Sequence, residues 1–457
     1  MNIFSHIDKF ENNILFFEND KTFFYRDVLS FEKKFKSFKK NTLILFVSDY
    51  TSEFLMTYIS LMRKDLKIML IDSNLNKNDI SKIILSYKPN YIFLNRKIKL
   101  DLNNYENNLE FDDSIILKNK KNENYQIYNE LVLLLGTSGS TGSKKFVRIS
   151  KKNLYSNTEN ISNYLKIKSD DITITTLPPQ YTYGLSIINS HIFSGSAVCI
   201  NNSSFMEKLF WEKANKFKVN NFGGVPFNYE ILKKLKFTKK KIPSLKYVTQ
   251  AGGHLDGDVK KYFLEDAKKN NYQFIVMYGQ VEATSRISYL PFEKLEQKFE
   301  SAGQPIKDGK LSISPQDNEI IFEGPNVCLG YANSYKDLSK GDENNGKLRT
   351  GDIGKIDADG FLFILGRKNR EAKLYGHRVN LDEIETILTR QGFKCLCLIK
   401  KNKIFIFNLD NTGNQKILKF LSKKLNVNIN ALFIKNLKNP PINSSGKISY
   451  SNLEQLI

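Results

Sequence analysis

Short apolar runs alternate with segments whose apolar residues recur at helical intervals between residues 42 and 94. A run near residues 42–47 precedes a helical pattern over residues 54–62, and a second run follows at residues 68–71. This order predicts a strand, a helix and a second strand of one β-α-β unit. A predicted helix over residues 79–87 and a strand over residues 91–94 continue the alternation. The pattern therefore predicts an α/β fold with a doubly wound parallel sheet.

The same alternation returns over residues 217–278. This stretch contains a strand-like segment that ends in glycines at residues 247–253, a helix from Asp256, and a strand with the sequence QFIVMYG. Ligands of open α/β sheets bind beyond the carboxyl ends of the strands. We therefore expect Gly252, Gly253 and Tyr278 to border a ligand site.

A third apolar run, at residues 131–135, predicts a buried strand that leads directly into a polar loop. This loop offers phosphate its backbone amides, its hydroxyl groups and a positive charge. The residues concerned are Thr137, Ser138, Gly139, Ser140, Thr141, Gly142 and Lys145. Residues 146–149 alternate like a second strand, and neither a Walker A loop nor a Rossmann fingerprint is present. On these residues alone, a phosphate-binding loop and a flexible Gly/Ser hairpin loop both stay open.

Five ordered motifs resemble those of the acyl-adenylate-forming (AMP-binding) superfamily, which includes acyl-CoA synthetases and adenylation domains. They are TSGSTGSKKFV at 137–147, YGQVE at 278–282, RTGDIG at 349–354, GRKNREAKLYGHRV at 366–379 and SSGKI at 444–448. The resemblance implies a large N-terminal α/β domain with doubly wound sheets, residues 1–366, that binds ATP and the acid. It also implies a mobile α+β C-terminal lid domain, residues 367–457, with a hinge at Asn369 or Lys368.

The resemblance also implies a role for each matching residue. For ATP, it adds to the loop residues Gly252, Gly253, Tyr278, Gly279, Gln280, Asp352 and Arg367. Glu282 and Thr141 would hold Mg²⁺, and Lys447 and Glu282 would be the catalytic residues. Tyr181, Tyr183 and Gly184 would line the acid pocket. Lys373, Gly376 and Arg378 would face the pantetheine of the thiol substrate.

The function implied is ATP-dependent activation of a small carboxylic acid to an acyl-adenylate. The acyl group would then pass to CoA or to the phosphopantetheine of a separate carrier protein. One alternative is an amino acid–carrier protein ligase, which is disfavoured because no aspartate lies between Leu177 and Asn189 to pair with an ammonium group. Another is a catalytically weak nucleotide-binding protein, suggested by Val281 and Asn369, where the family usually has Thr and Asp.

Composition narrows these expectations further. A chain of 457 residues with 41% hydrophobic residues is long enough for at least two domains. The formal net charge of +21 is spread along the chain without a nucleic-acid-binding motif, so it favours ATP, CoA or an acidic carrier over specific nucleic acid. We expect no transmembrane segment and a cytoplasmic location. Cys395 and Cys397 are expected to pack in a strand, with no zinc site.

Overall fold

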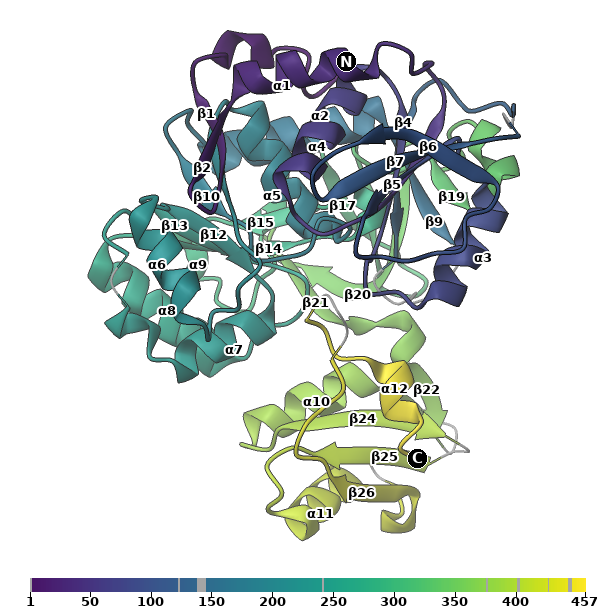
Figure 1. Ribbon diagram of the computed structural model, residues 1–457. Helices are drawn as coiled ribbons and strands as arrows, with labels where there is room; N and C mark the ends of the chain where they lie inside the picture. Colours follow the sequence, from purple (N-terminus) through teal and green to yellow (C-terminus); the bar gives the residue numbers. More distant parts are fainter. Residues whose placement is uncertain are drawn as a thin grey trace. The chain divides into compact units, whose positions relative to one another are not determined.

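The computed structural model describes residues 2–121, 124–137, 145–240, 242–374, 377–400, 403–425, 427–442 and 446–457, without the side chains of 371–374 and 377–378. The chain divides into two compact units, whose helices and strands are labelled in Figure 1. The first unit comprises Met1–Gln297, Pro305–Lys310 and Glu323–Leu348. The second unit comprises Lys298–Gln304, Leu311–Phe322 and Arg349–Ile457.

An eight-stranded sheet forms one part of the first unit, in the order β19-β9-β8-β4-β3-β5-β7-β6. Its strands are β3 (Leu43–Val47), β4 (Lys67–Ile71), β5 (Tyr91–Asn95), β6 (Tyr105–Glu110), β7 (Ser114–Asn119), β8 (Leu131–Gly136), β9 (Phe146–Ser150) and β19 (Gly330–Ala332). The central strands β8, β4, β3 and β5 run parallel. The predicted parallel sheet is thereby confirmed.

Two helices cover opposite faces of this sheet. Successive residues of a strand point to opposite faces, so each face has its own apolar side chains for a helix to cover. Ile44 and Phe46 of β3 pack in one core cluster with α2 (Ser52–Arg63). Leu45 and its neighbours pack in another cluster with α3 (Lys77–Tyr87). A strand buried on both faces explains the continuous apolar run in the sequence.

A nine-stranded sheet forms the other part of the first unit, in the order β16-β15-β14-β13-β12-β10-β11-β1-β2. Its strands are β1 (Ile14–Glu18), β2 (Lys21–Phe24), β10 (Ile172–Ile174), β11 (Ala197–Ile200), β12 (Asn221–Gly224), β13 (Tyr247–Gln250), β14 (Gln273–Tyr278), β15 (Ser288–Leu290) and β16 (Gln304–Pro305). Strands β12, β13 and β14 run parallel, as the alternation over residues 217–278 predicts.

The remaining helices of the first unit connect or flank these strands. They are α1 (Tyr25–Phe31), α4 (Lys151–Tyr164), α5 (Thr182–Phe193), α6 (Lys208–Lys216), α7 (Pro226–Lys234), α8 (Gly257–Asn270) and α9 (Phe292–Leu295). The predicted helix start at Asp256 is confirmed, because the Asp256 side chain caps α8 by accepting hydrogen bonds from the amides of Asp258 and Val259. Among the described residues, no helix is both long and apolar enough to cross a membrane.

The second unit contains three small sheets. The first sheet contains β17 (Lys310–Ile313), β18 (Glu319–Glu323), β20 (Lys347–Ile356) and β21 (Leu362–Arg367), and the first three of these strands each include one or two residues assigned to the first unit. The second sheet contains β22 (Glu371–Leu374) and β23 (His377–Asn380). The third sheet contains β24 (Cys395–Lys400), β25 (Lys403–Asn408) and β26 (Leu432–Asn436). Helices α10 (Leu381–Arg390) and α11 (Asn414–Leu425) pack on the last sheet, and α12 (Tyr450–Glu454) lies near the C-terminus. The α+β character expected for residues after 367 is confirmed, whereas the domain boundary and the hinge stay predictions.

The packing predicted for two cysteines of the second unit is also confirmed. Cys395 and Cys397 are buried in the core beside α10, and burial raises the pKa of the Cys395 thiol to about 12. The Asn380 side chain accepts hydrogen bonds from the amides of Asp382 and Glu383, so it caps the first turn of α10.

Candidate active site

The predicted phosphate loop is bounded by two antiparallel strands. Gly136 at the end of β8 pairs with Phe146 at the start of β9. The strand–loop–strand arrangement is confirmed, and the register brings the two ends of the loop together. Thr137 and Lys145 flank the loop, whereas the predicted phosphate contacts of residues 138–142 lie outside the described residues.

Three side chains from separate segments meet beside this loop. Tyr331 of β19 donates a hydrogen bond from its hydroxyl to Glu282 Oε1 at 3.0 Å. Lys145 Nζ lies 3.6 Å from the centroid of the Tyr331 ring, within cation–π range. Burial, reinforced by the Glu282 carboxylate, raises the pKa of Tyr331, so that its hydroxyl stays protonated and can donate. Tyr331 was not predicted as a site residue.

Glu282 has the chemistry that a magnesium ion needs. The hydrogen bond from Tyr331 engages Oε1, and Oε2 receives no hydrogen bond from the described residues. A carboxylate oxygen is a preferred ligand of Mg²⁺. The described residues contain no group of three or more His, Cys, Asp or Glu side chains placed to hold a metal. A metal site here would therefore need ligands from the loop or from ATP itself.

A tight turn after β14 presents Glu282. A Cβ added at Gly279 would lie 1.8 Å from the carbonyl oxygen of Ser285, so only glycine fits there. The Cys328 amide donates to the carbonyl oxygen of Glu282 at 2.8 Å. Asn326 Nδ2 donates to the carbonyl oxygen of Ala283, also at 2.8 Å. These contacts hold the turn against the segment that leads into β19.

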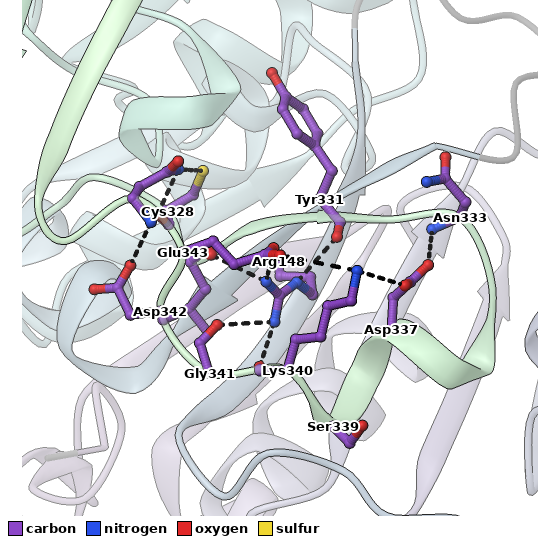
Figure 2. Close-up of polar contacts among 12 residues, drawn as sticks. Arg148, Cys328, Tyr331, Asn333, Asp337, Ser339, Lys340, Gly341, Asp342 and Glu343 are labelled. Atoms are coloured by element: carbon purple, nitrogen blue, oxygen red, sulfur yellow. Dashed lines mark hydrogen bonds and ion pairs between the residues drawn. The ribbon is translucent and has the colours of Figure 1, made fainter.

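Arg148 fixes the same segment from the other side. Figure 2 shows its guanidinium among the backbone carbonyls and the acidic side chain that surround it. It donates to the carbonyl oxygens of Leu329, Tyr331, Lys340 and Gly341 and pairs with Glu343 at 2.5 Å. Because Arg148 belongs to β9, this network ties the strand after the predicted phosphate loop to the strand that carries Tyr331.

The glycines predicted to bind ATP follow β13. Gly252 has a φ of +89°, a conformation that glycine adopts without strain. Gln250 Nε2 donates to the carbonyl oxygen of Gly253 at 3.0 Å. Because Gln250 pairs in parallel with Val276, these glycines and Tyr278 lie at the carboxyl edge of the sheet, as predicted.

The residues predicted to line the acid pocket begin α5. Tyr181 precedes the helix and is half-buried, whereas Tyr183 is buried. The Tyr183 hydroxyl donates to the carbonyl oxygen of Thr249 in β13 at 2.8 Å. A Cβ at Gly184 would lie 2.6 Å from the carbonyl oxygen of Pro178, so glycine is required. We call Tyr181, Tyr183 and Gly184 the predicted acid wall. The hydrogen bond from Tyr183 connects this wall to the strand that leads to Gly252. The role of the wall in acid binding stays a prediction.

Arg286 is a second residue that the sequence reasoning missed. It follows the Glu282 turn, its exposed fraction is only 2%, and its Cζ lies 4.4 Å from the centroid of the Tyr183 ring. An arginine between small and apolar residues in the sequence ATSRISYL was the available signal. The structure thus places a buried positive charge directly behind the predicted acid wall.

In the second unit, two of the residues predicted to bind ATP lie opposite each other on adjacent strands. Asp352 of β20 pairs with Arg367 of β21 across the sheet, and Asp352 Oδ1 lies 3.6 Å from Arg367 Nε. The Asp352 side chain is 14% exposed and that of Arg367 is 59% exposed. The pair therefore presents one largely buried carboxylate and one exposed cation from adjacent strands.

The remaining predicted residues also belong to the second unit. Lys447 follows Gly446, whose φ is +76°, and the flanking residues Ile442 and Ile448 form a β-bridge. Lys373 and Arg378 occupy paired positions of β22 and β23, and Gly376 lies outside the described residues. Their roles at the thiol face and the role of Lys447 in catalysis stay predictions.

Comparison with known proteins gives consistent results at two levels. The model of the AMP-binding enzyme family matches residues 35–332. A 2-succinylbenzoate–CoA ligase from Bacillus cereus is 26% identical over 353 residues, covering 72% of this chain and 70% of the relative. An oxalate–CoA ligase from Arabidopsis thaliana is 28% identical over 269 residues, covering 56% of this chain and 52% of the relative.

Among solved structures, the fold is similar to that of O-succinylbenzoate coenzyme A synthetase from Bacillus subtilis in complex with ATP and magnesium ion. The TM-score is 0.79 at 18% sequence identity, with 99% of each chain covered. The likeness at this identity concerns the fold, and it extends over both compact units.

Proposed function

The chain belongs to the AMP-binding enzyme family, and on this premise we propose that it is an ATP-dependent acid–thiol ligase. It converts a carboxylic acid and ATP to an acyl-adenylate and pyrophosphate, and then transfers the acyl group to a thiol. The observation that carries this proposal is the approach of Lys145, Tyr331 and Glu282 at the flank of the phosphate loop. This arrangement offers positive charge to phosphates and a carboxylate to their metal ion.

Residues of the first unit bind the phosphates, the base and the acid in the proposed reaction. The loop and Lys145 hold the β- and γ-phosphates, and Tyr331 keeps Glu282 oriented toward them. Tyr278 stacks on adenine, with the bare backbone of Gly252 and Gly253 against the ring. Glu282 and Thr141 would hold a magnesium ion, which would neutralise phosphate charge when bound. Tyr181, Tyr183 and Gly184 line the acid pocket.

Residues of the second unit act on the ribose and on the developing charge. The two oxygens of Asp352 accept hydrogen bonds from the two ribose hydroxyls, and Arg367 lies across the strand pair from it. Lys447 donates to the reacting carboxylate and the α-phosphate, where negative charge accumulates as they meet. Positioning of both reactants lowers the entropic part of the barrier.

We assign CoA as the acyl acceptor, because both named relatives are CoA ligases. Lys373, Gly376 and Arg378 belong to the face that receives its pantetheine. A separate carrier protein with the same phosphopantetheine group is the second acceptor to test. The acids named for these relatives, 2-succinylbenzoate and oxalate, are small dicarboxylates, so they head the substrate panel.

ATP–pyrophosphate exchange with a panel of small acids tests the first half-reaction. We expect exchange with at least one acid, and a fall of about a hundredfold or more in Glu282→Gln and in Lys447→Ala, because each loses charge that acts in the transition state. Lys423→Ala, at an exposed position of α11, is the matched control and should keep the wild-type rate. Exchange with no acid, or an unchanged rate in Lys447→Ala, would refute the proposal. ATP binding without pyrophosphate release would support a catalytically weak nucleotide-binding protein.

A further inference from the structure

Arg286 is a buried cation whose described partners are all uncharged. Its Nε lies 3.3 Å from both the Tyr164 hydroxyl and Met277 Sδ. Its Nη1 donates to Ser285 Oγ at 2.6 Å, and its Nη2 donates to Ser186 Oγ at 3.3 Å. No carboxylate among the described residues forms an ion pair with its guanidinium.

These partners do not use all the hydrogen-bond donors of the guanidinium. An arginine side chain carries five N–H groups, one on Nε and two on each terminal nitrogen. The Nε hydrogen is shared by a hydroxyl and a thioether, and each terminal nitrogen meets one hydroxyl. One N–H on Nη1 and one on Nη2 therefore have no acceptor among the described residues. A pair of donors on the two terminal nitrogens suits a carboxylate.

The aromatic neighbours supply no negative charge either. Burial raises the pKa of Tyr164 and of Tyr183, although the positive charge of Arg286 acts in the opposite direction on both. The two tyrosines are therefore neutral at neutral pH. A buried charge without a counter-ion is costly, because it has lost its hydration and gained no opposite charge. An anionic ligand group would remove this cost.

The position of Arg286 relates this charge to the proposed acid pocket. Its guanidinium contacts Tyr183 and Ser186, which lie one turn apart on α5. Tyr181 is half-buried, and its ring centroid lies 6.3 Å from that of Tyr183. Arg286 thus lies behind the wall, next to Met277, the residue that precedes Tyr278 in β14. Ser285 and Ser186 are the small side chains at its two terminal nitrogens.

We propose that Arg286 determines substrate specificity by pairing with a second anionic group of the acid, so that the substrate is a dicarboxylate. This inference rests on the proposed function, because it places the acid against Tyr181 and Tyr183. The reacting carboxylate lies toward ATP, and the distal carboxylate reaches the guanidinium, where it accepts hydrogen bonds from Nη1 and Nη2. A monocarboxylic acid leaves the cation without a counter-ion.

Matched acids test this inference on the full-length wild-type chain. The probes are 2-succinylbenzoate against 4-oxo-4-phenylbutanoate, which lacks the ring carboxylate, and adipate against hexanoate. We expect kcat/KM for pyrophosphate exchange to be about tenfold to a hundredfold higher for the diacid of at least one pair, as a buried charge-assisted hydrogen bond supports. Equal or better use of both monoacids, with exchange present, overturns this inference and leaves the proposed function intact. Exchange with no acid overturns both.

Variants locate the preference at Arg286. Arg286→Met removes the charge at similar volume and should abolish the difference between diacid and monoacid. Arg286→Lys keeps the charge without the planar fork and should restore part of the difference. Tyr164→Phe removes a neutral partner and should keep the preference. Thermal unfolding identifies variants that fail to fold, and in that case the matched acids on the wild-type chain decide. A diacid preference that survives in the folded Arg286 variants assigns the distal carboxylate elsewhere and refutes the inference.

Discussion

Two arginines of the first unit, Arg148 and Arg286, are almost equally buried but lie in opposite electrostatic surroundings. Arg148 is 0% exposed and Arg286 is 2% exposed. The guanidinium of Arg148 meets five oxygen acceptors, one for each N–H group, and one of them belongs to the Glu343 carboxylate. Among the described residues, the guanidinium of Arg286 meets three hydroxyl groups, a thioether and the face of the Tyr183 ring, but no carboxylate.

The contrast separates two uses of a buried charge. Arg148 joins β9 to the segment of β19, so its charge is compensated within the fold and its removal leaves oxygens unpaired. Arg286 lies behind the proposed acid pocket, so its compensation is expected from a ligand. A buried charge that the chain itself neutralises indicates structure, whereas one that the chain leaves partly unpaired indicates binding. Substitutions that remove one of these charges at a time test whether the two arginines differ in this way.

The largest effect is expected at Arg148. Arg148→Met should lower the free energy of unfolding of the first unit by about 3–5 kcal/mol, because the variant leaves several buried carbonyl groups without a donor. It should also reduce pyrophosphate exchange, since Tyr331 is no longer held at Glu282. Calorimetric unfolding and the exchange assay measure both. Arg148→Lys is the control, and it should lose less because it keeps the charge. A melting temperature equal to wild type would contradict the structural role.

A third arginine, Arg370 in the second unit, sharpens the comparison through pH. It pairs with Glu385 at 2.5 Å and with Asp382, and its Cζ lies 3.9 Å from the Tyr450 ring centroid. Burial raises the pKa of Glu385 to about 7, although Arg370 acts to lower it. Since the folded pKa exceeds the ordinary value of 4.5, the stability that Glu385 contributes is complete below pH 4.5 and is lost as the pH rises through about 7.

We therefore expect the second unit to lose on the order of 2–3 kcal/mol of stability between about pH 4.5 and pH 8 through this residue. Urea unfolding at several pH values measures the slope. Glu385→Gln should flatten the slope of stability against pH, because the amide does not titrate. The control is Glu212→Gln, which changes an exposed carboxylate paired with Lys208 and should leave the slope unchanged. A slope that persists in Glu385→Gln would assign the titration to another group.

Substitution of Glu343, the carboxylate partner of Arg148, is expected to change the stability less. The Glu343 side chain is 48% exposed, so solvent screens its charge. Glu343→Gln should cost about 1 kcal/mol, because the backbone carbonyls still receive hydrogen bonds from Arg148. The melting temperature of the variant provides the measurement. A loss as large as that of Arg148→Met would show that the carboxylate, rather than the carbonyl groups, holds the segment.

The sequence predicts the parts of the fold that depend on local burial. The runs at 42–47 and 68–71 correspond to β3 and β4, and the helical interval between them corresponds to α2. The order of motifs also predicts the superfamily, which the family comparison confirms. Asp352 and Arg367 were each singled out by motif, and a strand pair places them opposite each other. Periodicity succeeds here because each residue's environment repeats along its own element.

The sequence does not reveal contacts between distant segments. Tyr331 is 49 residues from Glu282, and Arg286 is 100 residues from Ser186. No local period encodes such pairs, since they arise only when the sheets assemble. The site could therefore be predicted as a set of motifs, whereas Tyr331 as a support for Glu282 and Arg286 as a buried charge required the structure.

The smallest effect on stability is expected at Arg286 itself. Arg286→Met removes a buried charge that has no carboxylate partner among the described residues, so the free energy of unfolding without ligand should change by less than about 1 kcal/mol in either direction. Lost hydrogen bonds to two serine hydroxyls offset the relief of the buried charge. Arg286→Lys keeps a more strongly hydrated cation in the same place and should be less stable than Arg286→Met. Urea unfolding of both variants beside Arg148→Met gives the measurement. A loss from Arg286→Met equal to that from Arg148→Met would mean that the guanidinium is already neutralised in the ligand-free chain, and the reason to expect a second anionic group on the acid would disappear.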